Sequence, residues 1–256
     1  MKSPYIPRKI AILGATSGMA EKTARLLAAD HNTLMLVARN EERLSAIASD
    51  LDIRGNGDVL SRIQDLELVG NPSEFFKSLA SETGGLDAVL IFHGYLGDQS
   101  LALTDATELD KILSGNFVST LHLSIAARQV LENSQHDIPV LLAIGSVAGD
   151  RGRSSNYLYG CAKSAICTLF EGMMHNAGLS GSKTSIILVK AGLTDSPMTA
   201  HLPKDGLLWS STDKLAQIIA ASMDKGSRIV YAPGYWRIIM WVIRMLPQSV
   251  LNRLNL

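Results

Sequence analysis

Apolar runs of strand length alternate with segments of helical periodicity along nearly the whole chain. Continuous apolar runs such as 86–92 are typical of strands that are buried on both faces. The pattern predicts strands over 9–13, 33–37, 59–63, 86–92, 138–144, 184–189 and 228–231. Helices are expected over 21–29, 41–49, 108–131, 157–177 and 213–223, with a further helix that begins at the Asn-Pro-Ser of 71–73.

Regular alternation of strand and helix predicts an α/β architecture. Parallel strands need crossover connections, and right-handed crossovers place helices on both faces of the sheet. The chain contains no internal repeat and no long linker. We therefore expect a single doubly wound (Rossmann) domain over residues 1–256, with a mostly parallel sheet of about seven strands. Residues 235–256 form an apolar helical tail in this interpretation.

Composition excludes several classes of function. The 24 Lys and Arg residues balance 24 Asp and Glu residues, so charge gives no argument for a nucleic-acid partner. Cys161 and Cys167 are too few for a disulfide framework, and the five histidines other than His93 show no metal-ligand spacing. No apolar run reaches the roughly 18 residues of a membrane span. We expect a cytoplasmic protein without a resident metal.

A glycine-containing turn follows the first strand and leads directly into a helix. Gly14 allows a sharp turn, and Gly18 allows a pyrophosphate to approach the helix N-terminus, whose free N–H groups favour an anion. Any tight strand-to-helix turn favours glycine, but this one lies at the first strand of an alternating pattern. The predicted pyrophosphate-binding residues are Gly14, Thr16, Ser17, Gly18 and Met19.

The end of the second strand bears on the choice of dinucleotide. A carboxylate there would favour NAD, whereas this chain has Arg39, whose guanidinium can bind a 2′-phosphate. The sequence therefore predicts NADP, with NAD possible. The alternative is a solvated arginine at the start of a charged helix. Asp65, after the third strand, either accepts the adenine amino group or caps a loop.

Three residues suit the reduction of a carbonyl. Tyr159 and Lys163 are four apart and share one helix face, and Ser146 ends the fifth strand at the edge where doubly wound sheets bind ligands. Hydride transfer to a carbonyl leaves an alkoxide that needs a proton. A nearby ammonium lowers the pKa of a phenol. We expect Tyr159 to donate the proton, Lys163 to lower its pKa and bind the nicotinamide ribose, and Ser146 to hold the substrate oxygen.

The glycine turn, Ser146 and the Tyr159–Lys163 pair follow one another in a familiar order and spacing. On these residues the chain resembles the short-chain dehydrogenase/reductase family over about residues 10–198. The resemblance implies that Asn116, on the long helix before the fifth strand, holds a proton-relay water. It also implies that the family's usual pairing through long helices gives a homo-oligomer.

The resemblance extends to two further segments, with departures. It assigns the nicotinamide carboxamide to the segment after the sixth strand, through Gly192, Thr194 and Ser196. Gly94 would allow close approach to the adenosine ribose, but the preceding family Asn-Ala is Phe-His here. His93 is either a structural loop residue or a contact to cofactor or substrate. Ala191 replaces a family proline and loosens that turn in our interpretation.

A loop and the tail indicate which kind of substrate the protein binds. Arg151 and Arg153, in the loop before the catalytic tyrosine, either meet a substrate phosphate or are solvated. The tail over 235–246 is apolar except for Arg237 and Arg244 and contains tryptophan, which suits a membrane interface or a lipid entrance. The alternative is a terminal helix packed on the core or on a second subunit.

The loop and tail together are similar to the family branch that includes the decaprenylphosphoryl-ribose 2-keto reductase. That similarity implies a keto-sugar substrate carried on polyprenyl phosphate, a flavin oxidase that acts before this enzyme, and contact with the inner face of a membrane. A soluble reductase of small carbonyl compounds has the same catalytic residues and is the main alternative. A non-catalytic dinucleotide-binding protein is the third interpretation.

Overall fold

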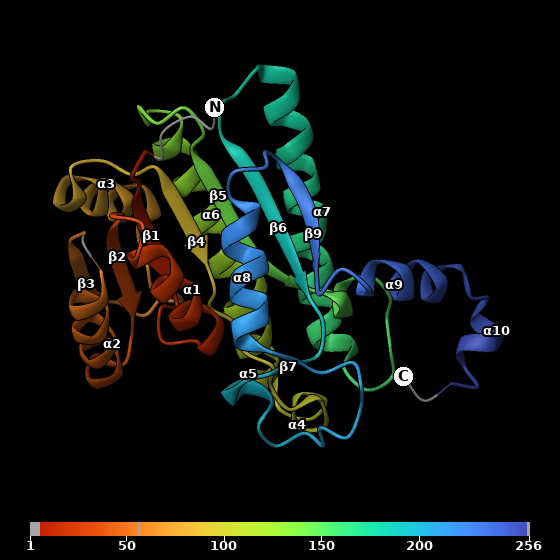
Figure 1. Cartoon of the computed structure of the whole chain (residues 1–256). Helices are drawn as coiled ribbons and strands as arrows, with labels where there is room; N and C mark the ends of the chain where they lie inside the picture. The colour runs from red at the N-terminus through yellow and green to blue at the C-terminus, as the bar shows by residue number, and fades with distance from the viewer. Residues whose placement is uncertain (1–5, 56, 255–256) are drawn as a thin grey trace.

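A parallel sheet forms the centre of this computed structural model, which describes residues 6–55 and 57–254. Within the described residues the sheet has seven strands in the order β3-β2-β1-β4-β5-β6-β9 (Figure 1). The strands are β1 Lys9–Leu13, β2 Thr33–Ala38, β3 Val59–Ile63, β4 Ala88–Ile91, β5 Val140–Ser146, β6 Ser185–Ala191 and β9 Arg228–Ala232. Each neighbouring pair is parallel. The predicted doubly wound fold is confirmed.

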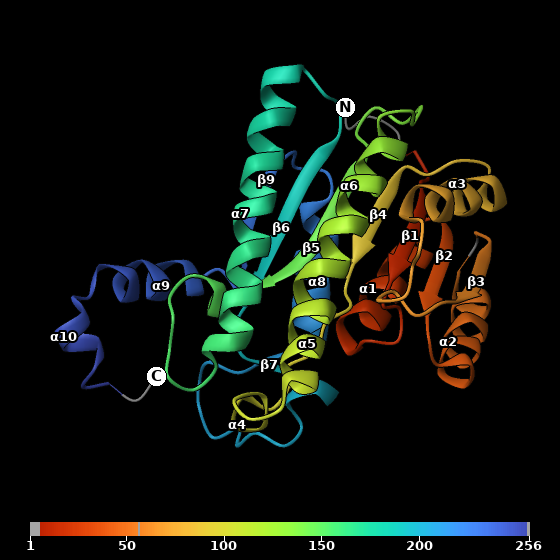
Figure 2. The same ribbon diagram turned by 180° about the vertical axis from the view of Figure 1, so that it is seen from behind.

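Helices cover both faces of the sheet because alternate residues of each strand point to opposite sides. In β1, Ile10 and Ile12 pack under one helical layer, whereas Ala11 and Leu13 pack under the other. The first layer comprises α1 Gly18–Ala28, α2 Glu41–Arg54 and α8 Thr212–Ser222. The second layer, in front in Figure 2, comprises α3 Pro72–Thr83, α6 Ser119–Leu131 and α7 Tyr157–Ser180.

The long helix predicted over 108–131 is interrupted. The structure has α5 Ala106–Leu113, a π-helical turn η1 at Ser114–Val118, and then α6. Side chains donate to two carbonyl groups of this segment: Asn116 Nδ2 donates to Ile112 O (2.8 Å), and Ser119 Oγ donates to Ser114 O (2.8 Å), which also accepts from the backbone N–H of Ser119. Apolar periodicity continues through this segment, so the pattern along the chain did not show the interruption.

Several short elements were not predicted. Helix α4 covers Gln99–Ala102, and strands β7 Thr194–Asp195 and β8 Ser210–Ser211 form a separate parallel pair. Single turns η2 Val147–Gly149 and η3 Pro197–Thr199 follow β5 and β7. Elements of two to four residues carry too few positions to show a period.

The tail extends sideways from the sheet as α9 Trp236–Met245 and α10 Gln248–Leu251 (Figure 1). Trp236 and Met240 are buried against the body of the protein, whereas a second apolar face of α9 is exposed. The last two residues of the predicted tail, 255 and 256, lie outside the described residues. In the part of the chain that is described, no helix is long and apolar enough to cross a membrane.

Candidate active site

A cleft of about 560 Å³ opens at the carboxyl ends of β1, β2 and β4. The sheet order reverses between β1 and β4, which is where open α/β sheets bind ligands. The predicted residues that line the cleft are Gly14, Thr16, Ser17, Arg39, Asp65 and Gly94. Six of the twelve residues assigned to a dinucleotide are thus brought to one place, whereas the other six do not line this cleft.

The turn after β1 requires glycine. Gly14 has a φ of +76°, and a Cβ there would lie 2.6 Å from the backbone nitrogen of His93. Ser17 is the N-cap of α1, with its hydroxyl accepting from the backbone N–H of Ala20 (3.2 Å). Gly18 is less constrained, since an added Cβ would meet only side-chain atoms, at 3.4 Å. Met19 packs on the core at the other side of the turn.

Arg39 and Asp65 face each other across the outer end of the cleft. Arg39 Nη1 lies 3.8 Å from Asp65 Oδ2, and the arginine side chain is 72% exposed. Asp65 Oδ1 accepts from the backbone N–H of Glu67 (3.0 Å), so the loop-capping role is present. Arg43 was not predicted: its Nη2 donates to Thr16 O (3.0 Å). The helical period gave no signal for it, because Arg39 lies before the N-cap of α2 and only Arg43 is in the helix.

Ser146, Tyr159 and Lys163 converge beside the inner end of the cleft. Ser146 ends β5, and the other two lie in the first turns of α7. Lys163 is buried, its Nζ donates to Ile144 O (3.2 Å), and it lies 5.7 Å from the centroid of the Tyr159 ring. The Ser146 side chain lies close enough to the Tyr159 hydroxyl to oppose the increase in the pKa of that phenol. The structure therefore brings the three predicted catalytic residues together.

Two glycines allow η2 to lie directly on α7. A Cβ at Gly160 would lie 2.9 Å from Ala148 O, and a Cβ at Gly149 would lie 2.8 Å from Lys163 O. Side chains at these positions would push the two backbones apart. This close approach holds the end of β5 against the turns that carry the tyrosine and the lysine.

Replacing Gly160 by alanine is expected to lower the free energy of unfolding by about 1–3 kcal/mol, the usual cost of overpacking. The matched control is Gly172→Ala in the same helix, where a Cβ meets nothing within 4 Å. There alanine is expected to stabilise by about 0.5–1 kcal/mol, because it favours the helix over glycine. Urea unfolding of both variants measures the difference, and equal effects would contradict the packing argument.

The pKa of the phenol differs from the value that the sequence led us to expect. Burial raises the pKa of Tyr159 to about 12, while Ser146 and the charge of Arg153 oppose that increase. Burial also lowers the pKa of Lys163 to about 8. The predicted lowering by Lys163 is wrong for this structure, since its Nζ is hydrogen-bonded to Ile144 O and burial disfavours its own charge. The phenol stays protonated near neutral pH, which suits a proton donor.

Asn116 is fully buried in the π-helical turn and has a positioning role. Its Oδ1 accepts from Tyr95 N (3.1 Å), and its Nδ2 donates to Tyr95 O and to Ile112 O. These bonds fix the loop after β4. A Cβ at Gly94 would lie 2.9 Å from Asn116 Oδ1 and 3.5 Å from Lys163 Nζ. Glycine is therefore needed at position 94 for the loop to lie beside Asn116 and Lys163.

His93 lies in that loop as a neutral imidazole. Its Nε2 is 2.8 Å from Ser119 Oγ, and Ser119 donates its proton to Ser114 O, so His93 Nε2 donates. Burial and then the charge of Lys163 lower the pKa of His93 to about 3. Its Nδ1 is buried and has no partner in the described residues. The contacts of Nε2 favour the structural role among the two predicted for this residue.

A buried network, which we call the Asp150 network, was not predicted. Lys190 Nζ lies 2.6 Å from Asp150 Oδ1, and the Tyr231 hydroxyl donates to Asp150 Oδ2 (2.7 Å). The side chains of Lys190 and Asp150 are only 4% and 2% exposed. The network ties the segment after Ser146 to β6 and β9, beside the position where alanine replaces the family proline.

The segment after β6 contacts the tail. A Cβ at Gly192 would lie 1.8 Å from Trp236 Nε1, so α9 requires glycine there. Thr194 is buried and donates to Gly192 O (3.0 Å). Ser196 lies 3.4 Å from Thr199 Oγ1, which donates to Thr194 O (2.6 Å) and was not predicted. This segment is well ordered by its own hydrogen bonds despite the missing proline.

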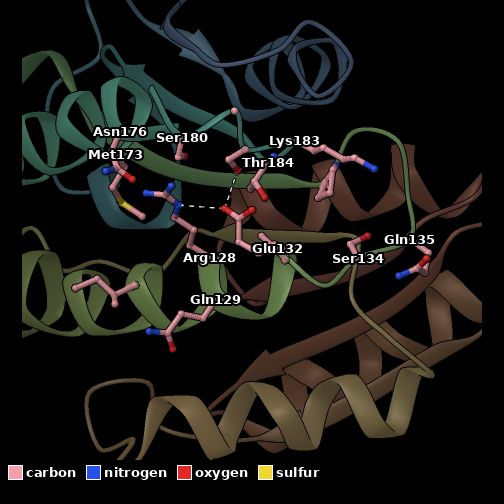
Figure 3. A pocket seen from close by; sticks show the side chains of 15 residues that line it. Arg128, Gln129, Glu132, Ser134, Gln135, Met173, Asn176, Ser180, Lys183 and Thr184 are labelled. Carbon is pink, nitrogen blue, oxygen red and sulfur yellow. Dashed lines mark hydrogen bonds and ion pairs between the residues drawn. The ribbon is translucent and has the colours of Figure 1, made fainter. Parts of the chain in front are cut away.

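A larger cavity, of about 840 Å³, lies at the opposite edge of the sheet (Figure 3). Its lining comes from α6, α7 and the segments that lead into β5 and β6. Glu132 accepts there from Arg128 (3.4 Å) and from Ser182 (2.6 Å). None of the predicted site residues lines it. Within the described residues, no group of three His, Cys, Asp or Glu side chains is arranged to hold a metal ion.

The cleft fits a dinucleotide. Two glycines at its floor, Gly14 and Gly94, hold backbone where a Cβ would collide, and α1 begins at its edge. Two guanidinium groups, those of Arg39 and Arg43, stand at its outer end. The side chains predicted to be catalytic lie at the other end. This distribution matches a ligand with phosphates at its centre and outer end and a reactive group near Tyr159.

Comparison with known proteins gives the same architecture. A family model described as short chain dehydrogenase matches residues 8–206. An "uncharacterized oxidoreductase" of Mycobacterium tuberculosis is 29% identical over 249 residues, which cover 96% of both chains.

Two solved structures share the fold. An alcohol dehydrogenase from the archaeon Thermococcus sibiricus, complexed with 5-hydroxy-NADP, has a TM-score of 0.76 at 20% identity and covers 87% of this chain and 95% of that one. A 3-oxoacyl-[acyl-carrier protein] reductase from Brucella melitensis, in complex with NAD, has a TM-score of 0.78 at 19% identity, with coverage of 91% and 99%.

Proposed function

The chain belongs to the short chain dehydrogenase family of oxidoreductases, and from that premise we propose that it reduces a carbonyl to an alcohol with NADPH. The observation that carries the proposal is the convergence of Ser146, Tyr159 and Lys163 beside a cleft that fits a dinucleotide. The test is oxidation of NADPH in the presence of a panel of ketones, aldehydes and keto-sugars. Absence of turnover on the whole panel would contradict it.

Each catalytic side chain has one task in this proposal. Bound NADPH supplies the hydride. Ser146 donates a hydrogen bond to the carbonyl oxygen, and Tyr159 gives its proton to the alkoxide that forms there. Lys163 stabilises the phenolate that remains and binds the nicotinamide ribose, while Asn116 holds the loop beside them and a relay water. The predicted cofactor residues bind as assigned above, with the carboxamide held by Gly192, Thr194 and Ser196.

NADPH is proposed as the preferred cofactor because two guanidinium groups flank the outer end of the cleft. We expect kcat/KM to be higher for NADPH than for NADH. Arg39→Ala is expected to reduce the preference, which is kcat/KM for NADPH divided by kcat/KM for NADH, about 10–100-fold, because a charge-assisted hydrogen bond contributes that much to affinity. Rates with NADH serve as the internal control, since NADH has no 2′-phosphate. A ratio unchanged in the variant would reject the role of Arg39.

For the substrate, we propose a keto-sugar, with the polyprenyl-phosphate-linked form as the specific candidate. The support is a cationic loop beside Tyr159 together with an exposed apolar tail. Oxidation of a sugar alcohol is one route to a keto-sugar, and we propose a flavin oxidase as the partner that supplies it. Keto-sugars with and without a prenyl phosphate distinguish the candidates. Preference for small soluble carbonyls would establish the alternative reductase instead.

We propose that the whole chain is one domain in the cytoplasm. Its tail makes a peripheral contact with the inner face of a membrane. Ile238, Trp241 and Met245 form an exposed apolar face on α9 and are 66–70% exposed. After Asp224 the chain has no acidic residue, whereas arginines flank this face. A cationic amphipathic helix with tryptophan suits an anionic lipid surface.

Vesicles with anionic lipid are expected to bind the full chain. The double variant Trp241→Ser, Met245→Ser should bind at least about tenfold more weakly, because each large apolar side chain contributes about 1.5–3 kcal/mol on burial. Co-sedimentation measures the binding, and neutral vesicles provide the comparison. Equal sedimentation of the two proteins would remove the tail from the contact.

A homo-oligomer through α6 and α7 is also proposed. Ile125 and Leu179 are exposed on these helices, at 46% and 77%. Sedimentation of the purified protein reports the oligomeric state directly.

A further inference from the structure

The loop over residues 150–156 joins the catalytic serine to the catalytic tyrosine, and most of its positions are anchored. Its first residue belongs to the Asp150 network. The next, Arg151, donates from Nη2 to Leu246 O (3.3 Å) and to Gln248 Oε1 (3.1 Å). Of the two arginines predicted to meet a substrate phosphate, Arg151 is thus hydrogen-bonded to the tail.

The far end of the loop is held by α4. Gln99 Nε2 donates to Ser154 O (2.7 Å), and Gln99 Oε1 accepts from Leu158 N (3.3 Å). Asn156 O accepts from Gly160 N (2.8 Å), which begins the first turn of α7. The loop is therefore preorganised on both sides of Arg153.

Arg153 itself is different. Its Nε is buried and has no hydrogen-bond partner, and no carboxylate of the described residues forms an ion pair with it. It lies close enough to Tyr159 that each charge affects the pKa of the other group, and burial lowers the pKa of Arg153. A part-buried guanidinium without a partner is costly unless a ligand supplies the anion.

We propose that Arg153 binds a phosphate group of the substrate, beside the carbonyl that Ser146 and Tyr159 act on. The inference rests on the proposed reductase function and assigns the substrate class of that site. Arginine presents five donors in a planar fork, which fits two oxygens of a phosphate ester. The anchored loop holds this fork in place, so little conformational entropy is lost when the ligand binds.

The experiment measures phosphate binding by calorimetry to the enzyme saturated with NADP⁺, which fills the cleft and removes its own phosphate sites from competition. The probes are inorganic phosphate, phenyl phosphate and farnesyl phosphate. We expect Arg153→Gln to weaken phenyl phosphate binding at least about tenfold, and Arg153→Lys to restore part of the loss because it keeps the charge. Farnesyl phosphate binding that also depends on Arg153 indicates a lipid source, and dependence limited to the soluble probes indicates a free sugar phosphate.

Lys183→Gln is the matched control. It removes one positive charge from an exposed position at the opposite edge of the sheet. An equal loss in this variant, or no loss in Arg153→Gln, would overturn the proposal. Thermal unfolding separates binding from a structural role: removing an unpaired arginine should leave Tm unchanged or higher, whereas a lower Tm would mark Arg153 as an anchor of the loop.

The reductase proposal is tested independently. NADPH oxidation by the unmodified enzyme with neutral carbonyl compounds does not depend on phosphate. An enzyme that turns over such compounds but binds none of the phosphate probes retains the proposed function and loses the phosphate site. An enzyme that binds the probes through Arg153 but reduces no carbonyl compound retains the phosphate site and loses the proposed reductase function.

Discussion

Tyr159→Phe is expected to lower kcat about 10²–10⁴-fold, the usual contribution of a positioned general acid. Phenylalanine keeps the ring and its packing but has no proton to give to the alkoxide. The affinity for NADPH should change little, because the predicted pyrophosphate and ribose contacts come from other residues. Steady-state kinetics and NADPH fluorescence titration measure the two quantities separately.

Tyr157 provides the matched control. It lies two residues earlier in the same helix and is 43% exposed. Tyr157→Phe removes the same hydroxyl from the same turn of α7 and is expected to leave kcat within about twofold. If the two variants lost activity equally, the defect would lie in the start of the helix, and Tyr159 would not be the proton donor.

The second large effect is on stability. Lys190→Met is expected to lower the free energy of unfolding by about 3–5 kcal/mol, because it leaves Asp150 buried without its cation. Burial alone would lower the pKa of Lys190, but the hydrogen bond with Asp150 and the neighbouring groups raise it, so the lysine is charged in the folded protein. Urea unfolding at neutral pH measures the change.

Lys204 offers the corresponding surface pair. Its Nζ contacts Asp195, and the two side chains are 34% and 57% exposed. Lys204→Met is expected to cost less than about 1 kcal/mol, since solvent screens an exposed pair. The double variant Lys190→Met, Asp150→Asn should recover part of the loss, because it removes the unpaired charge. A Lys190 variant as stable as the Lys204 variant would show that the Asp150 network does not support the loop.

Local pattern and order along the chain were sufficient for much of this protein. The alternation of apolar runs with helical segments determined the doubly wound sheet, because a strand buried on both faces gives a continuous apolar run, whereas an amphipathic helix repeats its apolar positions every three or four residues. The tyrosine and lysine were identified together because residues four apart share a helix face. Asn116 was found by resemblance, but its interrupted helix was not, since a π-helical turn leaves the apolar pattern intact.

Contacts between distant segments were beyond such reasoning. Lys190 and Asp150 are 40 residues apart, and Tyr231 and Asp150 are 81 apart. Nothing local to any of the three residues indicates the pairing. The same holds for Gly192, whose contact with Trp236 only appears once the tail is placed against the end of β6.

The sequence by itself thus determined the fold class and the family resemblance, and it was sufficient to predict the catalytic side chains, because each depends on short spacings along one strand or helix. Only the tertiary structure decided how charged groups are paired. It separated Arg151, bound to the tail, from Arg153, left without a partner, and it showed that burial raises the pKa of the Tyr159 phenol. Pairing and burial depend on which distant segments come together, and that information exists only once the chain has folded.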